Sequence, residues 1–278
     1  MKQNFWRWLY KFIFLDIVHG GFFHQKEKPD FSTATSTNDL KSFFKEIGIE
    51  IFLDKKKSKE DLSNTSTLIY SNHPTSFDPL MIVVAENLEK VKIVSVLVNK
   101  LFFPFYEDRI IPVASTCTTP RLSPGVLQTR VAEKAENFTK DEAEKTNHTV
   151  PELAVQSLVQ KTPVLIFPPG ATNQWHDGIG FIVDEFVRKN PTKKLNFQPL
   201  HVSGTTTVGM LWHGWKLLFG FKKPLQMKIT RGKNFDLSFL KKEKLLDIED
   251  KKTRAKAIRA FLEEKYSKEF EKEARFYK

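Results

Sequence analysis

The chain has 278 residues, 40% of them hydrophobic, so it is long enough to bury the core of one large domain. Its formal net charge of +11 favours anionic partners such as a membrane surface, an acidic protein, a phosphate-bearing small molecule or nucleic acid. The single cysteine, Cys117, excludes an intrachain disulfide and a cysteine metal cluster, and it predicts a reducing compartment.

The first 25 residues are predicted to form an amphipathic helix that lies in a membrane interface. Arg7 and Lys11 recur at four-residue spacing, with aromatic and aliphatic residues around the rest of the helix. One alternative is a helix that packs on the core. A signal peptide fits less well because Arg7, Lys11 and Asp16 interrupt the apolar region. No stretch approaches the roughly 20 apolar residues that a spanning helix needs.

Residues 26–40 are rich in Ser and Thr and are predicted to be a linker to a domain over 41–278. Strands are expected at 48–53, 67–71, 91–98, 110–113, 164–167, 195–202 and 225–230, and helices at 41–47, 79–88, 152–159 and 254–268. The Lys- and Glu-rich segment 133–148 is expected to be a solvated surface insertion. The alternation of strands and helices predicts an α/β fold, with a mixed, mostly parallel sheet covered by helices.

The segment from Tyr70 to Pro79 carries the first candidate for catalytic chemistry. His73 and Asp78 are separated by four residues and follow an apolar strand. A carboxylate can hold an imidazole in one tautomer and support its positive charge, so the pair suits general-base catalysis. Ser76 is predicted to be the N-cap of the following helix, which places Asp78 in the first turn. Taken alone, the pair favours a plainer interpretation, a surface histidine beside a turn aspartate.

A second block, Phe167-Pro168-Pro169-Gly170-Ala171-Thr172, follows at the end of a later predicted strand. Together with Asn72-His73-(four residues)-Asp78, it resembles the glycerolipid acyltransferase family, whose signatures are His-x4-Asp and Phe-Pro-Glu-Gly. The family includes lysophosphatidic acid acyltransferases and relatives that acylate lysophospholipids. The resemblance covers most of the chain, from about residue 44 to about residue 270. It implies a glycerol-phosphate acyltransferase-like fold and an acyltransferase domain over 41–278.

The chain departs from the family at the positions that read the acceptor. Pro169 stands where the family usually has Glu, and Ala171-Thr172 replaces the common Thr-Arg. The strand at 110–115 corresponds to a family block that ends in Val-Asp-Arg, but it has no arginine. Thr172 is closer to the relatives that acylate lysophospholipids. The acceptor is therefore the open question, more than the type of chemistry.

The resemblance implies acyl transfer from a thioester to a lipid hydroxyl by direct attack. His73 is the expected base and Asp78 the residue that orients it. Backbone N–H groups from Gly170 onward are the candidate oxyanion donors, because Pro168 and Pro169 have none. The predicted substrate-binding residues are Asn72, Ser76, Lys100, Arg109, Phe167, Pro168, Gly170, Ala171 and Thr172.

Cations must replace the missing family arginines if the acceptor carries a phosphate. Lys100, Arg109 and Arg121 lie between the two blocks and are the candidates, although each alone is typical of a solvated surface charge. The aromatic run 101–106 is expected to line either the core or the acyl chain.

The expected partners are a membrane lipid surface, an acyl thioester donor (acyl-CoA or acyl-carrier protein) and a lysolipid or glycerol-phosphate acceptor. No metal, no further cofactor and no nucleic acid are expected, and the location is peripheral, on the cytoplasmic face of a membrane. The first alternative is a non-catalytic lipid-binding homologue of the same fold. A nucleic-acid-binding protein is a distant third, because basic and acidic residues are interleaved throughout 236–278.

Overall fold

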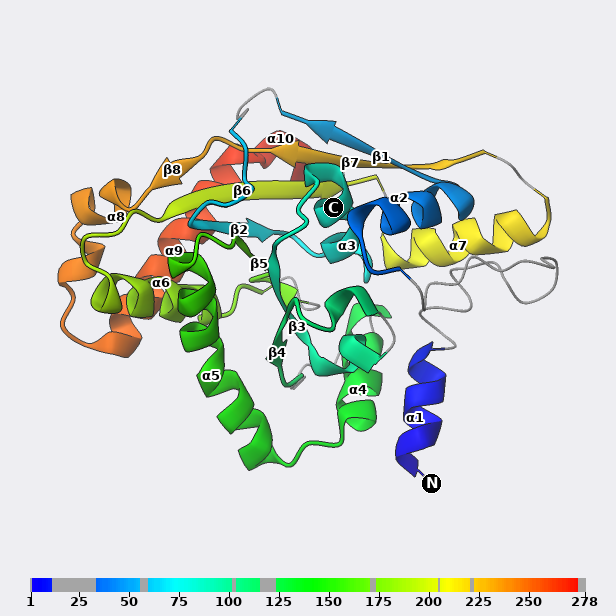
Figure 1. Cartoon of the computed structure of the whole chain (residues 1–278), viewed down its shortest axis with the longest axis horizontal. Helices are drawn as coiled ribbons and strands as arrows, with labels where there is room; N and C mark the ends of the chain where they lie inside the picture. Colours follow the sequence, from blue (N-terminus) through cyan, green and yellow to red (C-terminus); the bar gives the residue numbers. More distant parts are fainter. Residues whose placement is uncertain are drawn as a thin grey trace.

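The computed structural model describes residues 2–11, 34–55, 60–101, 104–115, 124–170, 174–204, 206–220 and 223–274. They fold as a mostly parallel mixed sheet covered by helices (Figure 1), which confirms the predicted fold class at this level. The strands are β1 Ile49–Asp54, β2 Thr67–Ser71, β3 Lys92–Val96, β4 Ile110–Val113, β5 Val164–Ile166, β6 Asn196–Ser203, β7 Leu225–Arg231 and β8 Phe235–Asp236.

The helices comprise α1 Lys2–Lys11, α2 Thr37–Glu46, α3 Asp78–Glu86, α4 Pro124–Glu136, α5 Lys140–Val159, α6 Gly178–Lys189, α7 Thr207–Leu218, α8 Ser238–Lys242, α9 Lys251–Glu269 and α10 Glu271–Ala274. Short 3-10 helices are η3 Leu97–Leu101, η4 Pro104–Tyr106 and η6 Leu245–Asp247.

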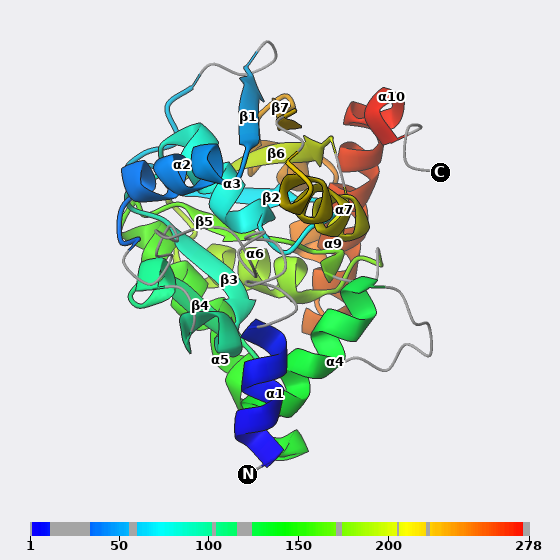
Figure 2. The same cartoon turned by 90° about the vertical axis from the view of Figure 1, so that its right-hand side faces the viewer.

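The strand order is β1-β7-β6-β2-β5-β3-β4, with β8 paired to β6. Five neighbouring strands, β6, β2, β5, β3 and β4, run parallel to one another, whereas β7 and β8 are antiparallel to β6 and β1 is parallel to β7. The ends of the five parallel strands therefore meet along one side of the sheet, which we call the carboxyl edge. The ends of β2 and β6 lie on the right of Figure 1, the side that faces the viewer in Figure 2. Ligands in open α/β sheets bind at this edge.

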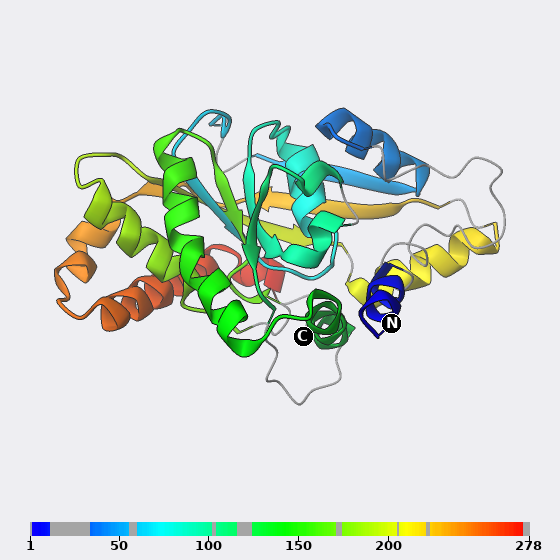
Figure 3. The same cartoon turned by 60° about the horizontal axis from the view of Figure 1, so that its bottom comes forward.

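Both faces of the sheet are buried. Every residue of β2 is buried, and its side chains alternate between two clusters: Ile69 faces the cluster under α2 and α3, while Leu68 and Tyr70 face the cluster under α5, α6 and α9. Figure 3 shows the helices on both sides of the strands. Burial on both faces explains why the strands are continuous apolar runs rather than alternating ones.

The segment 133–148 is not the surface insertion that its charge predicts. It forms the end of α4 and the start of α5, and it buries Ala135 and Ala143. The Asn147 amide exchanges two hydrogen bonds with the backbone of Ala114, at 2.8 and 3.3 Å. Its alanines form the buried face of the two helices, whereas its abundant lysines and glutamates make the sequence look like a solvated segment.

The predicted linker is also shorter than 26–40. Helix α2 begins at Thr37, four residues before the predicted start, because Ser36 and Asp39 form a reciprocal capping box. Residues 26–33 lie outside the described part of the chain.

Helix α1 packs one face against α4. Trp6 and Leu9 contact a small cluster on α4 and η3, and Lys134 lies 4.1 Å from the Trp6 ring centre. The Arg7 guanidinium donates to the Ala135 carbonyl at 3.3 Å, so it is turned toward α4 rather than toward lipid phosphates as the interfacial helix predicts. The opposite face exposes Phe5 and Trp8. The predicted helix beyond Lys11 lies outside the described residues.

Among the described helices, none combines the length and hydropathy needed to cross a bilayer.

Candidate active site

His73 lies just beyond the carboxyl end of β2, in the middle of the sheet. Its Nδ1 is 3.0 Å from Oδ2 of Asp78, the first residue of α3. The Asp78 side chain is fully buried, whereas that of His73 is 26% exposed. The structure thus brings the predicted pair together with the carboxylate on the inside and the imidazole reaching the surface.

Thr75 holds the Asp78 carboxylate in place. The Thr75 backbone N–H donates to Oδ2 at 2.7 Å, and its hydroxyl donates to Oδ1 at 2.6 Å. The prediction that Ser76 caps α3 is wrong: the N-cap is Phe77, with helical backbone angles and no side-chain capping bond. The helix therefore begins one residue later than a Ser76 cap would give. The Asp78 carboxylate, rather than a Ser76 side chain, accepts the backbone N–H of the turn, that of Thr75.

This arrangement defines the chemistry of the imidazole. A carboxylate is an acceptor, so Nδ1 carries the hydrogen, and the lone pair is then on Nε2 at the far side of the ring. Nε2 points away from the buried Asp78 and is the atom placed to accept a proton. The pair therefore has the geometry of a general base with an orienting partner.

The second predicted block meets the first at this point. The Phe167 ring lies 4.6 Å from the His73 ring, centre to centre, with the planes 32° apart. The contact follows from the sheet register, because β2 and β5 are neighbours and Tyr70 pairs with Ile166. Two motifs almost a hundred residues apart in the sequence thus form one site.

The loop after Phe167 is a tight turn. Gly170 has φ +49°, a backbone conformation that favours glycine, and its N–H donates to the Phe167 carbonyl at 3.0 Å. This N–H is therefore engaged within the turn, which weighs against the predicted role of Gly170 as an oxyanion donor. Pro168 and Pro169 are buried and have no N–H to offer. Ala171 and Thr172 lie outside the described residues.

Asn72 connects the site to β6. Its side-chain amide donates to the Val202 carbonyl at 2.8 Å and accepts from the Val202 N–H at 2.7 Å, which extends the β2–β6 pairing by a side chain. The Asn72 backbone N–H donates to the Tyr266 hydroxyl of α9 at 3.3 Å. Asn72 was predicted to bind substrate, but its amide is occupied by backbone, so it positions the His73 turn.

The two described cations predicted to bind the acceptor lie at different edges of the sheet. Arg109 precedes β4, at the amino end of the parallel strands, where it binds the carbonyl of Phe105 and stacks on its ring. It thus lies at the opposite ends of the parallel strands from His73, and its described contacts do not support the predicted role in acceptor binding. Lys100 is exposed on η3, which follows β3 at the carboxyl edge. Arg121 lies outside the described residues.

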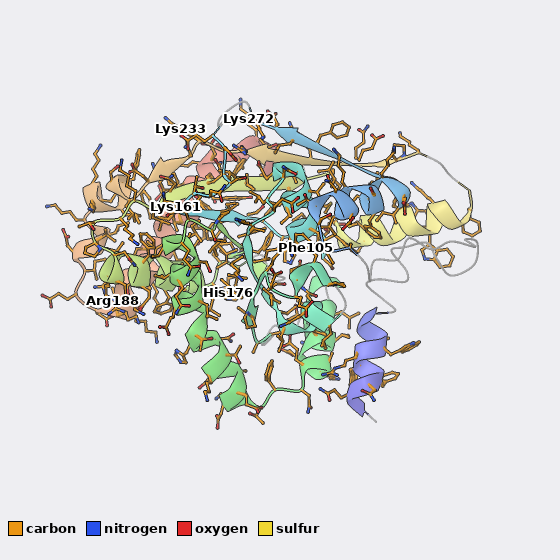
Figure 4. The ribbon with its side chains drawn as sticks, in the orientation of Figure 1. Phe105, Lys161, His176, Arg188, Lys233 and Lys272 are labelled. Atoms are coloured by element: carbon orange, nitrogen blue, oxygen red, sulfur yellow. The ribbon has the colours of Figure 1, made fainter. Side chains whose placement is uncertain are left out.

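The aromatic run 101–106 belongs in part to the core. Phe105 and Tyr106 are fully buried in the cluster under α2 and α3, and the position of Phe105 can be followed in Figure 4. Phe102 and Phe103 lie outside the described residues. The described aromatics of this run therefore support core packing.

Two residues at the site carry no sequence signal. A Cβ added to Gly170 would lie 3.8 Å from Cδ2 and Nε2 of His176, an exposed residue labelled near the middle of the molecule in Figure 4. The Tyr266 hydroxyl also lies 2.8 Å from Nδ1 of the buried His201, in addition to its bond from Asn72. Tyr266 comes from a helix far from either motif, whereas His176 follows the second block by four residues but is not part of its pattern.

Glu136, at the end of α4, joins the carboxyl ends of β3 and β4. Its carboxylate accepts from the Val98 N–H at 3.1 Å and from the Ser115 N–H at 3.4 Å. Burial raises the pKa of Glu136 from 4.5 to about 7, although these N–H groups lower it in part. The group is therefore protonated in the folded state at pH values where it ionises in the unfolded chain.

Glu136→Gln is expected to stabilise the protein increasingly as the pH rises. The folded pKa lies above the unfolded one, so the stability from this carboxyl is complete below about pH 4.5 and lost through about pH 7. Glutamine stays neutral at every pH. The difference in free energy of unfolding between the variant and wild type should therefore shift in favour of the variant by about 1–3 kcal/mol from acid to alkaline pH. Urea unfolding at both pH values measures this difference.

The matched control is Glu142→Gln on α5. Hydrogen bonds from Thr139 lower the pKa of Glu142, so its stabilising effect is present at neutral pH and fades in acid, the opposite direction. An equal effect of Glu136→Gln at both pH values would contradict a pKa raised by burial.

Within the described residues, no cluster of His, Cys, Asp and Glu has the arrangement of a metal site. No protein-family model matches this sequence, and no curated protein matches it.

Proposed function

We propose that the protein is an O-acyltransferase of phospholipid biosynthesis. It would move a fatty acyl group from acyl-CoA or acyl-carrier protein to the hydroxyl of a glycerol-phosphate-type lipid, such as 1-acyl-glycerol-3-phosphate or a lysophospholipid. The observation that carries the proposal is the imidazole of His73, held by the buried Asp78 and packed against the Phe167 ring of the second motif. The corresponding fold assignment, glycerol-phosphate acyltransferase-like, is part of the same proposal.

The reaction follows from the position of Nε2. The acceptor hydroxyl attacks the thioester carbonyl while Nε2 of His73 takes its proton, and the new C–O bond forms. The tetrahedral intermediate then collapses with loss of the C–S bond, and the imidazolium returns the proton to the leaving thiolate. Asp78 supports the positive charge of the imidazolium between the two steps. No acyl-enzyme is formed.

Peripheral attachment to the cytoplasmic face of a membrane is the second part of the proposal. Phe5 and Trp8 project from the face of α1 opposite the one that packs on α4, and each is more than half exposed. Aromatic side chains of this kind suit the headgroup region of a bilayer.

A non-catalytic lipid-binding homologue is the alternative. It is favoured by Pro169 in place of the family glutamate and by the Gly170 N–H, which is engaged within its own turn. It predicts lipid binding without thioester consumption. The retained His73–Asp78 hydrogen bond favours the enzyme instead.

One assay separates the two functions. The protein is incubated with a long-chain acyl thioester and, in separate reactions, with lysophospholipids, lysophosphatidic acid or glycerol phosphate. Free thiol released only with one acceptor would support the enzyme and identify that acceptor. Lipid binding without thiol release in any reaction would support the lipid-binding homologue.

A further inference from the structure

Helix α7 carries an apolar stripe on its outer side. Val208, Trp212 and Trp215 lie along one side of the helix, and Phe219, the first residue after it, continues their spacing of four, three and four residues. Trp212 is 61% exposed, Trp215 52% and Phe219 71%. The Trp215 and Phe219 rings stack with their centres 6.1 Å apart. We call these four residues the α7 stripe.

The stripe is not the face by which α7 joins the fold. The inner face buries Met210 and His213, and the Nε2 atom of His213 lies 3.2 Å from the Ile47 carbonyl at the end of α2. The helix is therefore apolar on two opposite sides. An exposed row of large aromatics on a helix that is already anchored indicates a contact made with something outside the chain.

The charges around the stripe favour an anionic bilayer. The sequence from Gly204 to Phe235 contains no Asp or Glu, and Lys216 on α7 lies 5.8 Å from the Trp212 ring centre. Tryptophan beside lysine is the combination that occupies membrane interfaces, with the ring at headgroup depth and the ammonium near phosphate. A second copy fits less well, because two stripes face to face would bring their lysines together.

The helix that carries the stripe lies at the same edge of the sheet as the candidate active site. Helix α7 connects the end of β6 to the start of β7, so it lies at the carboxyl edge, where His73 follows β2. It contacts α4, which also contacts α1. Figures 2 and 3 show α1, α4 and α7 on one side of the molecule. Phe5 and Trp8 of α1 and Leu127 of α4 are further exposed apolar side chains on these helices.

We propose that the α7 stripe is a bilayer-docking surface, which inserts its aromatic side chains among anionic phospholipid headgroups and holds the carboxyl edge of the sheet against the membrane. The ligand is the lipid surface itself, and binding requires no thioester and no acceptor.

Vesicle co-sedimentation of the full chain tests the proposal, with phosphatidylcholine vesicles that either contain or lack phosphatidylglycerol. Wild type should bind the anionic vesicles more tightly, and its tryptophan emission should shift to the blue. Trp212→Ser/Trp215→Ser should weaken this binding roughly tenfold or more, because two aromatic side chains no longer leave water. Both substitutions are at exposed positions, so the thermal midpoint should stay close to that of wild type.

The matched control is Phe52→Ser/Phe239→Ser, which removes two exposed aromatics from β1 and α8 and should leave binding unchanged. Equal binding by wild type and the tryptophan variant, or no binding by wild type, would overturn the proposal. A lipid-free dimer that the tryptophan variant abolishes would assign the stripe to a second copy instead. Since no thioester is present, none of these outcomes bears on the proposed acyl transfer.

Discussion

His73→Ala is expected to lower the rate of acyl transfer by roughly 10²–10⁴-fold, the usual contribution of a positioned general base. The variant should keep its fold, because His73 is partly exposed at the end of β2 and its described contacts are with Asp78 and the Phe167 ring. The rate of thiol release from a long-chain acyl thioester, with the acceptor identified by the panel, measures the loss. Circular dichroism and the thermal midpoint check the fold.

His148→Ala provides the matched control, since this histidine is exposed on α5 and should be dispensable.

Asp78→Asn should also lose activity, because an amide cannot support the imidazolium as a carboxylate does. Adding it to His73→Ala should cause little further loss, as expected for residues that act as a unit. Wild-type rates in a folded His73→Ala protein would rule out His73 as the base.

Arg231→Ala is expected to lower the free energy of unfolding by about 3–5 kcal/mol. Arg231, at the end of β7, and Glu86, at the end of α3, are both almost completely buried and form a bidentate ion pair. Truncation of the arginine would leave the Glu86 carboxylate buried, with only the longer contact at 3.9 Å from Lys55 among its described cationic partners. The pair fixes α3, the helix whose first residue is Asp78. Urea unfolding measures the effect.

Arg188→Ala is the matched control. Arg188 pairs with Asp184 and Glu185 but is half exposed, at the periphery of the molecule in Figure 4. Its loss should cost about 1 kcal/mol or less. The double variant Arg231→Met/Glu86→Leu should recover most of the stability, because neither charge then remains buried. If Arg231→Ala and Arg188→Ala were equally stable, the buried pair would not be what fixes α3.

The strands could be predicted because their signal is local. The runs at 67–71 and 110–113 are short, apolar and bounded by turn residues, and they match β2 and β4 at both ends. Helices with a narrow buried face among many charged residues were harder to predict. In α5 the small residue Ala143 forms the buried side among lysines and glutamates, so the pattern resembles a solvated segment. Helix α7 was not predicted, since with two apolar sides it lacks the polar face that marks an amphipathic helix.

The site was predictable only where a motif carried it. His73, Asp78 and Phe167 converge because their strands are neighbours, and the motif spacing anticipates that. The predictions that the structure does not support concern the positions of residues within the folded sheet, which sequence distance does not give. Arg109 looks close to the site in sequence, but it lies at the opposite edge of parallel strands. Tyr266 is almost two hundred residues from Asn72, yet its hydroxyl accepts the Asn72 N–H.

Simultaneous measurement of free thiol and acyl ester during one incubation with thioester and acceptor tests the proposed reaction most directly. Direct attack by a hydroxyl activated by His73 predicts ester and thiol in equal amounts, only when the acceptor is present, with both formed roughly 10²–10⁴-fold more slowly by His73→Ala. Thiol release that is independent of the acceptor, or an acyl group trapped covalently on the protein, would contradict direct transfer. Equal yields from wild type and His73→Ala would contradict the role of His73.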